Sequence, residues 1–234
     1  MLPGKLFISL IFIILIAGVI IMSQTGEIRE YCTNHKGGLF DLGYLSKTIF
    51  KDIPLANLRK YVTRLVEDGM LHQISKGIFI IGDTELSNEE IILKHYLIDH
   101  LVIIKGIPAK EYLLSTLELT SKENIDITIY SNQTFSNKNI CDINVLASKD
   151  VYTLVTSELA ILLELIHCES VIEEEYEVAW SYKIYELAKS YKDANFSKHH
   201  MFYPRKVYIR LANLLESMYI SNRVMEIYES KKEL

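Results

Sequence analysis

Apolar residues recur at the spacing of an α-helix in three places within the first third of the chain. Residues 24–36 predict a first helix, which ends at Gly37 because glycine leaves the helical conformation at little cost. Asp41 is placed to cap a short second helix through its side-chain oxygens. The apolar positions of that helix are Leu42, Leu45, Ile49 and Phe50. Residues 54–68 predict a third helix, whose buried stripe comprises Leu55, Leu58, Val62, Leu65 and Val66.

An extended pattern follows Gly69, which ends the third helix. Residues 70–74 and 78–81 predict the two strands of a hairpin. The residues that join these strands are Ser75, Lys76 and Gly77. Helix, turn, helix and hairpin therefore follow one another over residues 41–81. This order predicts a winged helix-turn-helix that binds DNA, and we place the domain that contains it at residues 23–83.

Residues 84–234 combine helical and extended patterns. Ser87 and Glu90 have the spacing of a capping box, and Pro108 suits the first turn of another helix. Alternating apolar residues predict two strand regions of a small antiparallel sheet, at Ile125, Ile127 and Ile129 and at Ile140, Ile143 and Val145. Long helices are predicted over residues 156–168, 176–191 and 204–220. The predicted fold class is α+β, with an N-terminal winged helix-turn-helix followed by a mostly helical domain with a small antiparallel sheet.

Charge is distributed unevenly along the chain. The formal net charge is −5, which argues against a protein that coats nucleic acid with its whole surface. Residues 46–77 nevertheless carry six cations and three anions, a local charge of +3 that leaves −8 for the rest. One basic segment, which coincides with the predicted DNA-binding unit, therefore lies in an otherwise acidic protein.

The third predicted helix carries its polar residues opposite its buried stripe. An α-helix fits the major groove of DNA, where asparagine and arginine read base edges while lysine and tyrosine hold phosphate oxygens. The hairpin is expected to reach a flanking phosphate or the minor groove. The candidate DNA-binding residues are Asn57, Arg59, Lys60, Tyr61, Arg64, His72, Gln73 and Lys76. A charged helix face by itself is usually only solvated, but the neighbouring turn and hairpin favour DNA binding here.

A family resemblance is carried by residues 45–81, whose sequence is LSKTIFKDIPLANLRKYVTRLVEDGMLHQISKGIFII. This segment resembles the N-terminal winged helix of AbiE-type antitoxins. The positions that match the family pattern are Lys60, Arg64, Leu65, Val66, Gly69, Leu71, Ile74, Gly77, Ile78 and Phe79. The segment that begins at Gly106 resembles the family more loosely, because it lacks the family's proline after Thr120. In total the resemblance covers residues 23–170.

The resemblance implies a cytoplasmic transcriptional regulator that binds repeated operator sites and represses its own operon. It further implies an antitoxin that counteracts a nucleotidyltransferase-like toxin encoded in that operon. The antitoxin role rests on the resemblance alone, because residues 86–234 display no toxin-binding chemistry. We expect this second domain, residues 84–234, to serve either homodimer formation or contact with a partner.

The apolar run at residues 6–22 leaves the location of the protein open. It follows Lys5 and has the composition of a membrane anchor, although its length is near the lower limit for spanning a bilayer. The alternative is that translation starts at Met22, so that residues 1–21 are not part of a cytoplasmic protein. A protein anchored in the inner membrane, whose winged helix binds other proteins, is therefore the competing interpretation.

The sequence contains no catalytic or cofactor motif. Glycine-rich phosphate loops, paired catalytic carboxylates and metal-ligand spacings of histidine or cysteine are all missing, so we expect no enzyme activity, no metal and no cofactor. Cys32, Cys141 and Cys168 are widely spaced and odd in number, which predicts reduced core thiols. His199 and His200 are adjacent, and we expect both at the surface.

Overall fold

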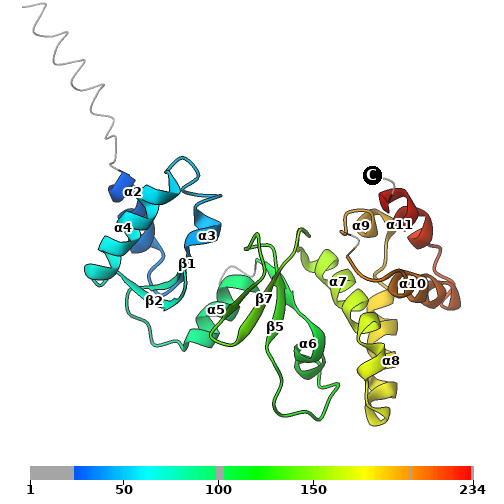
Figure 1. Ribbon diagram of the computed structural model, residues 1–234. Helices are drawn as coiled ribbons and strands as arrows, with labels where there is room; N and C mark the ends of the chain where they lie inside the picture. Colours follow the sequence, from blue (N-terminus) through cyan, green and yellow to red (C-terminus); the bar gives the residue numbers. More distant parts are fainter. Residues whose placement is uncertain (1–23, 99–102, 201, 233–234) are drawn as a thin grey trace, which may run out of the picture.

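The computed structural model describes residues 24–98, 103–200 and 202–232. The apolar run at residues 6–22 lies outside these ranges. The prediction that this run is an anchor, or that it precedes the true start, therefore concerns residues outside the described part of the chain. Within the described ranges, no helix is both long enough and apolar enough to cross a membrane. The chain forms an N-terminal lobe and a helical C-terminal lobe on either side of a central sheet (Figure 1).

The N-terminal lobe combines short helices with a three-stranded antiparallel sheet in the described part of the chain. Its helices are α2 (Gln24–Asn34), α3 (Leu42–Leu45) and α4 (Leu55–Glu67). Its strands are β1 (Leu39–Asp41), β2 (Leu71–Ser75) and β3 (Ile78–Ile81), in the order β1-β3-β2. The first and third predicted helices and the hairpin are confirmed, with Gly77 at a φ of +75° in the turn. Strand β1 is too short to leave a periodic pattern in the sequence.

The second helix ends earlier than its apolar spacing predicts. α3 stops at Leu45 and a turn follows, so Ile49 is 56% exposed and its predicted burial is wrong. The helical period no longer decides which side chain faces the core once the chain has left the helix. The cap itself is confirmed, because the Oδ1 atom of Asp41 accepts hydrogen bonds from the N–H groups of Gly43 and Tyr44.

The sheet of the N-terminal lobe is covered on both faces, and every residue of β3 is buried. Phe79 and Ile81 pack with α2 and α4 on one face. Ile78 and Ile80 pack on the other face with residues of α5 (Asn88–Tyr96) and of the central sheet. The hairpin is therefore supported by the rest of the protein and does not project freely into solvent.

The central sheet is mixed. Its strands are β4 (Gly106–Pro108), β5 (Thr128–Ser131), β6 (Lys138–Ile140) and β7 (Ile143–Ala147), in the order β4-β5-β7-β6. The predicted small sheet is present, and β4–β5 and β6–β7 pair antiparallel. The central pair β5–β7 is parallel, which differs from the predicted antiparallel arrangement. After β5 the chain first forms the edge strand β6 and then reverses direction in a tight hairpin. The next strand, β7, therefore lies between β6 and β5 and runs parallel to β5.

Two local signals flank this sheet. The capping box of Ser87 and Glu90 begins α5 as predicted. Pro108 belongs to β4, and the helix predicted there, α6 (Lys110–Thr116), begins two residues later. Glycine is required at Gly106, because a Cβ atom there would lie 2.2 Å from the carbonyl oxygen of Tyr130.

The C-terminal lobe packs α-helices around one apolar core. The helices in its described part are α7 (Leu154–His167), α8 (Glu177–Ala188), α9 (Asp193–Phe196), α10 (Arg205–Ser217) and α11 (Val224–Lys232). Two 3₁₀ turns, η1 (Glu169–Val171) and η2 (Glu174–Tyr176), connect α7 to α8. The helices predicted over residues 156–168, 176–191 and 204–220 are confirmed as α7, α8 and α10.

A buried carboxylate fastens α7 to its neighbours. Glu164 is fully buried, and its two oxygens accept hydrogen bonds from the N–H of Lys110 and the hydroxyl of Tyr203, both at 2.7 Å. Burial and the adjacent carboxylate raise the pKa of Tyr203 well above its usual value, so this tyrosine is a permanent donor. Burial of a charged group at this position without such partners would cost a large amount of free energy.

One of the predicted core thiols lies at the surface. Cys32 and Cys168 are buried, whereas Cys141 is exposed. Burial raises the pKa of Cys32 to about 11 and that of Cys168 to about 12, which keeps both thiols protonated. Cys141 occupies the β6–β7 turn with a φ of 49°, and this turn faces outward.

Candidate nucleic-acid interface

Helix α4 separates its apolar and cationic residues onto opposite faces. Leu58, Val62 and Leu65 are at most 3% exposed and anchor the helix to the lobe. Leu55 and Val66, which the sequence pattern also predicts to be buried, are 42% and 36% exposed. The buried stripe is thus narrower than predicted, and a wider part of the helix faces solvent.

The solvent-facing side of α4 carries three cations. Arg59, Lys60 and Arg64 are exposed, and Lys60 and Arg64 lie four residues apart on adjoining turns. None of the three has a carboxylate partner within the described residues. We call these three side chains the α4 ridge. Its charges are available to an external anion.

Two predicted contact residues lie at the margin of this ridge. Asn57 and Tyr61 are half-buried on the flank of α4 that turns toward α2. The ring of Tyr61 packs against the core of the lobe, and its hydroxyl donates to Oε1 of Gln24 at 3.4 Å. The prediction that Tyr61 faces fully into solvent is therefore wrong, because the helix turns this flank toward its neighbour. Only its hydroxyl end borders the ridge.

The hairpin presents the three remaining candidates. Lys76 is exposed at the tip, where the N–H of Leu42 donates to the carbonyl of Gly77 at 3.0 Å and holds the tip beside α3. Gln73 is exposed, and its amide donates to the carbonyl of Ser75. His72 is exposed with Nε2 3.6 Å from a carboxylate oxygen of Asp83. Lys76 is consequently the lysine that the hairpin presents to solvent.

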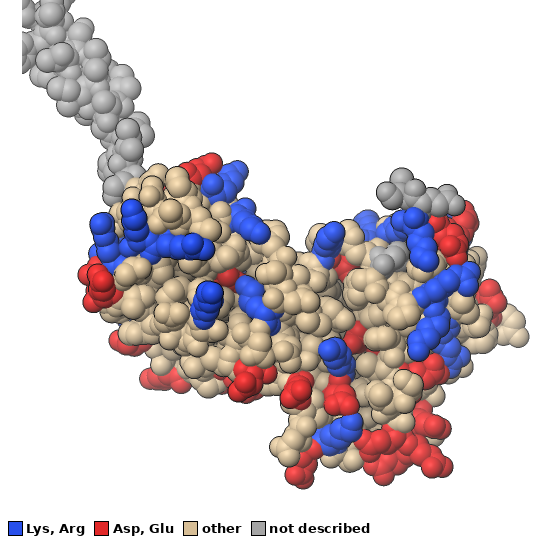
Figure 2. All heavy atoms as spheres, in the orientation of Figure 1, with Lys and Arg blue, Asp and Glu red and all other residues tan. Residues whose placement is uncertain are grey.

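The molecular surface shows the same separation of charge. Lysine and arginine side chains gather over α4 and the adjoining part of the N-terminal lobe on the face shown in Figure 2. Aspartate and glutamate side chains lie mainly along the lower edge of that view. Further lysine and arginine side chains lie over the C-terminal lobe in the same view. A protein with a net charge of −5 thereby offers a basic surface over α4 to a polyanion.

A buried polar centre joins the N-terminal lobe to the central sheet. Asp41 is 1% exposed, and its Oδ2 atom accepts hydrogen bonds from the Tyr96 hydroxyl at 2.7 Å and from Nζ of Lys138 at 2.5 Å. The other oxygen caps α3. We call Asp41, Tyr96 and Lys138 the buried centre. One carboxylate thus sets the start of α3 and also joins it to α5 and β6.

His95 lies next to this centre. Burial, together with the positive charges of Lys105 and Lys138, lowers the pKa of His95 to about 4. Its Nε2 atom has no hydrogen-bond partner within the described residues. The imidazole is therefore neutral at physiological pH and belongs to the packing of the lobe interface.

The sequence indicates only part of this centre. The capping role of Asp41 follows from its position before a helix, whereas Tyr96 and Lys138 lie 55 and 97 residues further along the chain. No local pattern connects residues at such separations. The described residues also contain no group of three histidine, cysteine or carboxylate side chains placed to hold a metal ion.

Comparisons with known proteins add no assignment. No family model matches the chain, and no curated protein sequence matches it either. The function must therefore be argued from the residues, their geometry and the resemblance of residues 45–81.

Proposed function

We propose that residues 41–81 form a winged helix-turn-helix and that this unit binds duplex DNA with α4 in the major groove. The observation that carries the proposal is the α4 ridge, three exposed cations on the solvent side of one helix, which have no acidic partner among the residues that the structure describes. The element order supports it, since a capped short helix precedes α4 and a glycine-tipped hairpin follows.

The side chains of α4 suit two kinds of contact. Arg64 has a planar guanidinium, which pairs bidentately with a guanine edge, and Asn57 can pair in the same way with adenine. Arg59 and Lys60 suit phosphate oxygens, which position a protein on the duplex. The Tyr61 hydroxyl could donate to a phosphate only by exchanging its hydrogen bond to Gln24.

The hairpin supplies the second contact of the proposal. Lys76 projects from the tip and reaches a phosphate beside the groove that α4 occupies, or the adjoining minor groove. Because β3 is buried along its whole length and the N–H of Leu42 bonds to the carbonyl of Gly77, Lys76 is presented on a supported tip. His72 and Gln73, on the same strand, extend this contact.

We further propose that the protein is a cytoplasmic transcriptional repressor of its own operon and the antitoxin of a toxin–antitoxin pair. The support for the antitoxin role is the resemblance of residues 45–81 to AbiE-type antitoxins. The partner would be a nucleotidyltransferase-like toxin, and a homodimer would match repeated operator sites. Co-expression with the protein encoded beside it tests this role, which predicts relief of growth arrest.

The DNA-binding proposal is tested by fluorescence anisotropy of the full chain with the duplex upstream of its own gene, at two salt concentrations. We expect salt-dependent binding that Lys60→Ala/Arg64→Ala abolishes, because phosphate contacts release counterions. The matched control is Lys94→Ala/Lys206→Ala, which removes two exposed cations elsewhere. Absence of binding at low salt, or equal loss in both double variants, contradicts the proposal.

A further inference from the structure

A groove in the C-terminal lobe has the size of a ligand site. Its volume is about 320 Å³, within the range of small-molecule pockets. It lies where the chain leaves the central sheet, enters α7 and later passes α9. The lining residues at the sheet end are Lys149, Asp150 and Val151; those of α7 and its cap are Thr153, Thr156 and Leu159; those of α9 and beyond are Asn195, Lys198, His199 and His200.

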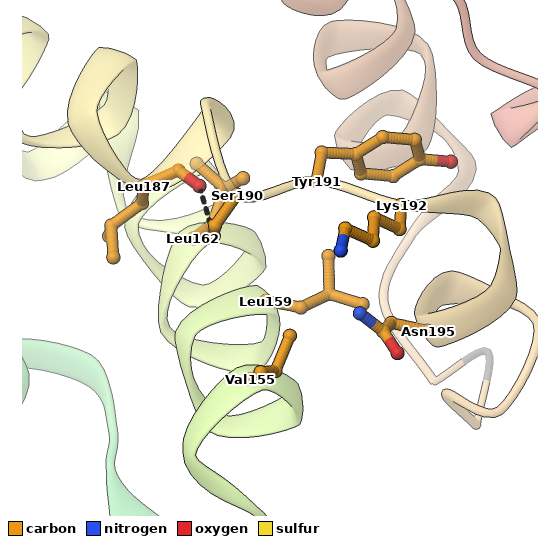
Figure 3. A pocket seen from close by; sticks show the side chains of 8 residues that line it. All are labelled: Val155, Leu159, Leu162, Leu187, Ser190, Tyr191, Lys192 and Asn195. Atoms are coloured by element: carbon orange, nitrogen blue, oxygen red, sulfur yellow. Dashed lines mark hydrogen bonds between the residues drawn. The ribbon is translucent and has the colours of Figure 1, made fainter.

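A neighbouring hollow on α7 is much smaller. It is lined by residues of α7 and of the segment from Leu187 to Asn195 (Figure 3), and its volume is about 10 Å³. That space holds roughly one water molecule. The two spaces share Leu159 and Asn195, but only the groove admits a ligand.

The floor of the groove holds a buried histidine beside a buried aspartate. His199 and Asp150 are 5% exposed each, and Nδ1 of His199 lies 2.8 Å from Oδ2 of Asp150. The N–H of His200 donates to the other oxygen of Asp150 at 2.7 Å. His199 is therefore an interior residue, and the expectation that it lies at the surface is wrong. Its Nε2 atom has no hydrogen-bond partner within the described residues.

The rim of the groove is cationic. Lys149 and Lys198 are exposed, and neither has a carboxylate partner within the described residues. Lys231 does not line the groove, and its Nζ atom donates to the carbonyl of His199 at 2.6 Å. Asp150 is the one carboxylate among the described lining residues. Its Oδ1 atom accepts from the N–H of His200, whereas its buried Oδ2 atom has no hydrogen-bond partner within the described residues. The two lysines outnumber this single carboxylate, so the rim of the groove favours an anion.

The start of α7 adds to this preference. Its capping residues Thr153 and Thr156 line the groove, and the N-terminus of a 14-residue helix carries a positive partial charge that favours phosphate groups. Val151 and Leu159 supply apolar lining beside it. A phosphate attached to an apolar or aromatic group matches both parts.

We propose that this groove binds a small phosphate-bearing molecule, with Lys149 and Lys198 as its principal contacts. The ligand's phosphate lies between these two lysines at the start of α7, and its apolar part lies against Val151. This site is separate from the proposed DNA interface. It makes the C-terminal lobe a receiver of a small-molecule signal, and its function does not depend on whether α4 binds DNA.

The test is isothermal titration calorimetry of the full chain with two probes, inorganic phosphate and adenosine monophosphate. We expect saturable binding of both, with tighter binding of the nucleotide because of the apolar lining. Lys149→Ala and Lys198→Ala should each weaken binding about tenfold, as expected for one charge-assisted hydrogen bond. Lys206→Ala, which removes an exposed lysine outside the groove, should leave the affinity unchanged.

Three results would overturn the proposal. One is that neither probe binds at millimolar concentration. Another is that both probes bind equally well to Lys149→Ala/Lys198→Ala, which would place the ligand elsewhere. A loss of duplex affinity in this variant, without binding of either probe, would also overturn it and assign the lysines to DNA. Lys60→Ala/Arg64→Ala should retain nucleotide binding, so that failure of the DNA proposal is recognised separately.

Discussion

The cations of α4 and the arginines of the C-terminal lobe differ in whether a carboxylate lies beside them. On the C-terminal helices, arginines are held by nearby carboxylates. These pairs are Arg205–Glu229, Arg210–Glu169 and Arg223–Glu226. The α4 ridge has no such partners within the described residues. Paired cations are neutralised where they lie, whereas unpaired cations on one helix face create a local field that attracts a polyanion.

A second contrast separates exposed from buried ion pairs. The Arg210–Glu169 pair is more than 40% exposed on both sides, whereas Asp41 and Lys138 are 1% and 19% exposed. Water screens the first pair and leaves it little net effect on stability. The second pair is mostly shielded from water, so removal of either member leaves a largely buried charge without compensation. The strongest test of the structure therefore lies at the buried centre.

The largest effect is expected from Asp41→Ala. This change removes the cap of α3 and leaves Lys138 without its carboxylate, and we expect a loss of about 3–5 kcal/mol in the free energy of unfolding. Urea denaturation of the full chain measures it. Glu169→Ala, which breaks an exposed pair, is the control and should cost less than about 1 kcal/mol. Similar losses in both variants would contradict the expectation that the buried centre stabilises the fold more than an exposed ion pair does.

A somewhat smaller loss in the free energy of unfolding is expected when the pH is lowered. The pKa of His95 is lowered to about 4 in the folded protein, whereas an unfolded histidine has a value near 6.5. Between these values the unfolded chain binds the proton and the folded protein does not. Stability is therefore full above about pH 6.5 and falls as the pH drops toward 4, by about 3 kcal/mol in total.

Denaturation at pH 7.5 and pH 5 checks this window. His95→Gln should remove most of the difference between the two pH values that arises from this group. His72→Gln, at an exposed histidine of the hairpin, should keep the pH dependence of the original protein. An unchanged pH dependence in His95→Gln would show that other groups cause the acid sensitivity.

The contrast between unpaired and paired arginines predicts a difference in DNA affinity. Arg64→Ala should weaken binding to the operator duplex by about 1–3 kcal/mol if its guanidinium reads a base. Arg210→Ala removes the same charge from a paired position and should leave affinity nearly unchanged. Anisotropy titrations at one salt concentration compare the two. If both variants bind equally well, the α4 ridge is not the contact surface.

The smallest effect on stability is expected from Ala56→Glu, which should stabilise the protein slightly and weaken its binding to DNA. Ala56 is exposed one turn before Lys60, so Ala56→Glu supplies the acidic partner that the α4 ridge lacks. An i, i+4 pair of this kind stabilises a helix by about 0.2–0.5 kcal/mol. The new carboxylate also repels phosphate, so DNA affinity should fall. Thermal unfolding and anisotropy together check the two signs, and Ala56→Gln controls for side-chain size.

Much of the N-terminal lobe is predictable because its signals are short-range. The buried residues of α4 repeat within three or four positions, and the turn glycine and the cap of α3 lie next to the elements they define. Exceptions arise at the edges of elements. Ile49 is exposed because α3 ends early, and Tyr61 is half-buried because α2 covers that flank. The exposed cations of the α4 ridge follow from the period of the helix.

The phosphate-binding groove is not predictable in the same way. His199 meets Asp150 from 49 positions away, and neither residue occurs in a motif. The available signal was the adjacent pair of histidines, which local reasoning places at the surface. Burial reversed that expectation for His199, since its side chain packs among Phe196, Phe202 and Tyr203.

The sequence by itself determined the long helices α2, α4, α7, α8 and α10, the hairpin and the cationic face of α4, because each depends on residues within a few positions of one another. Only the tertiary structure decided the parallel pairing of β5 with β7, the buried centre of Asp41, Tyr96 and Lys138, and the groove around His199. These features join residues far apart in the chain. Their partners are selected by packing and by the need to satisfy buried charges, and neither leaves a periodic pattern in the sequence.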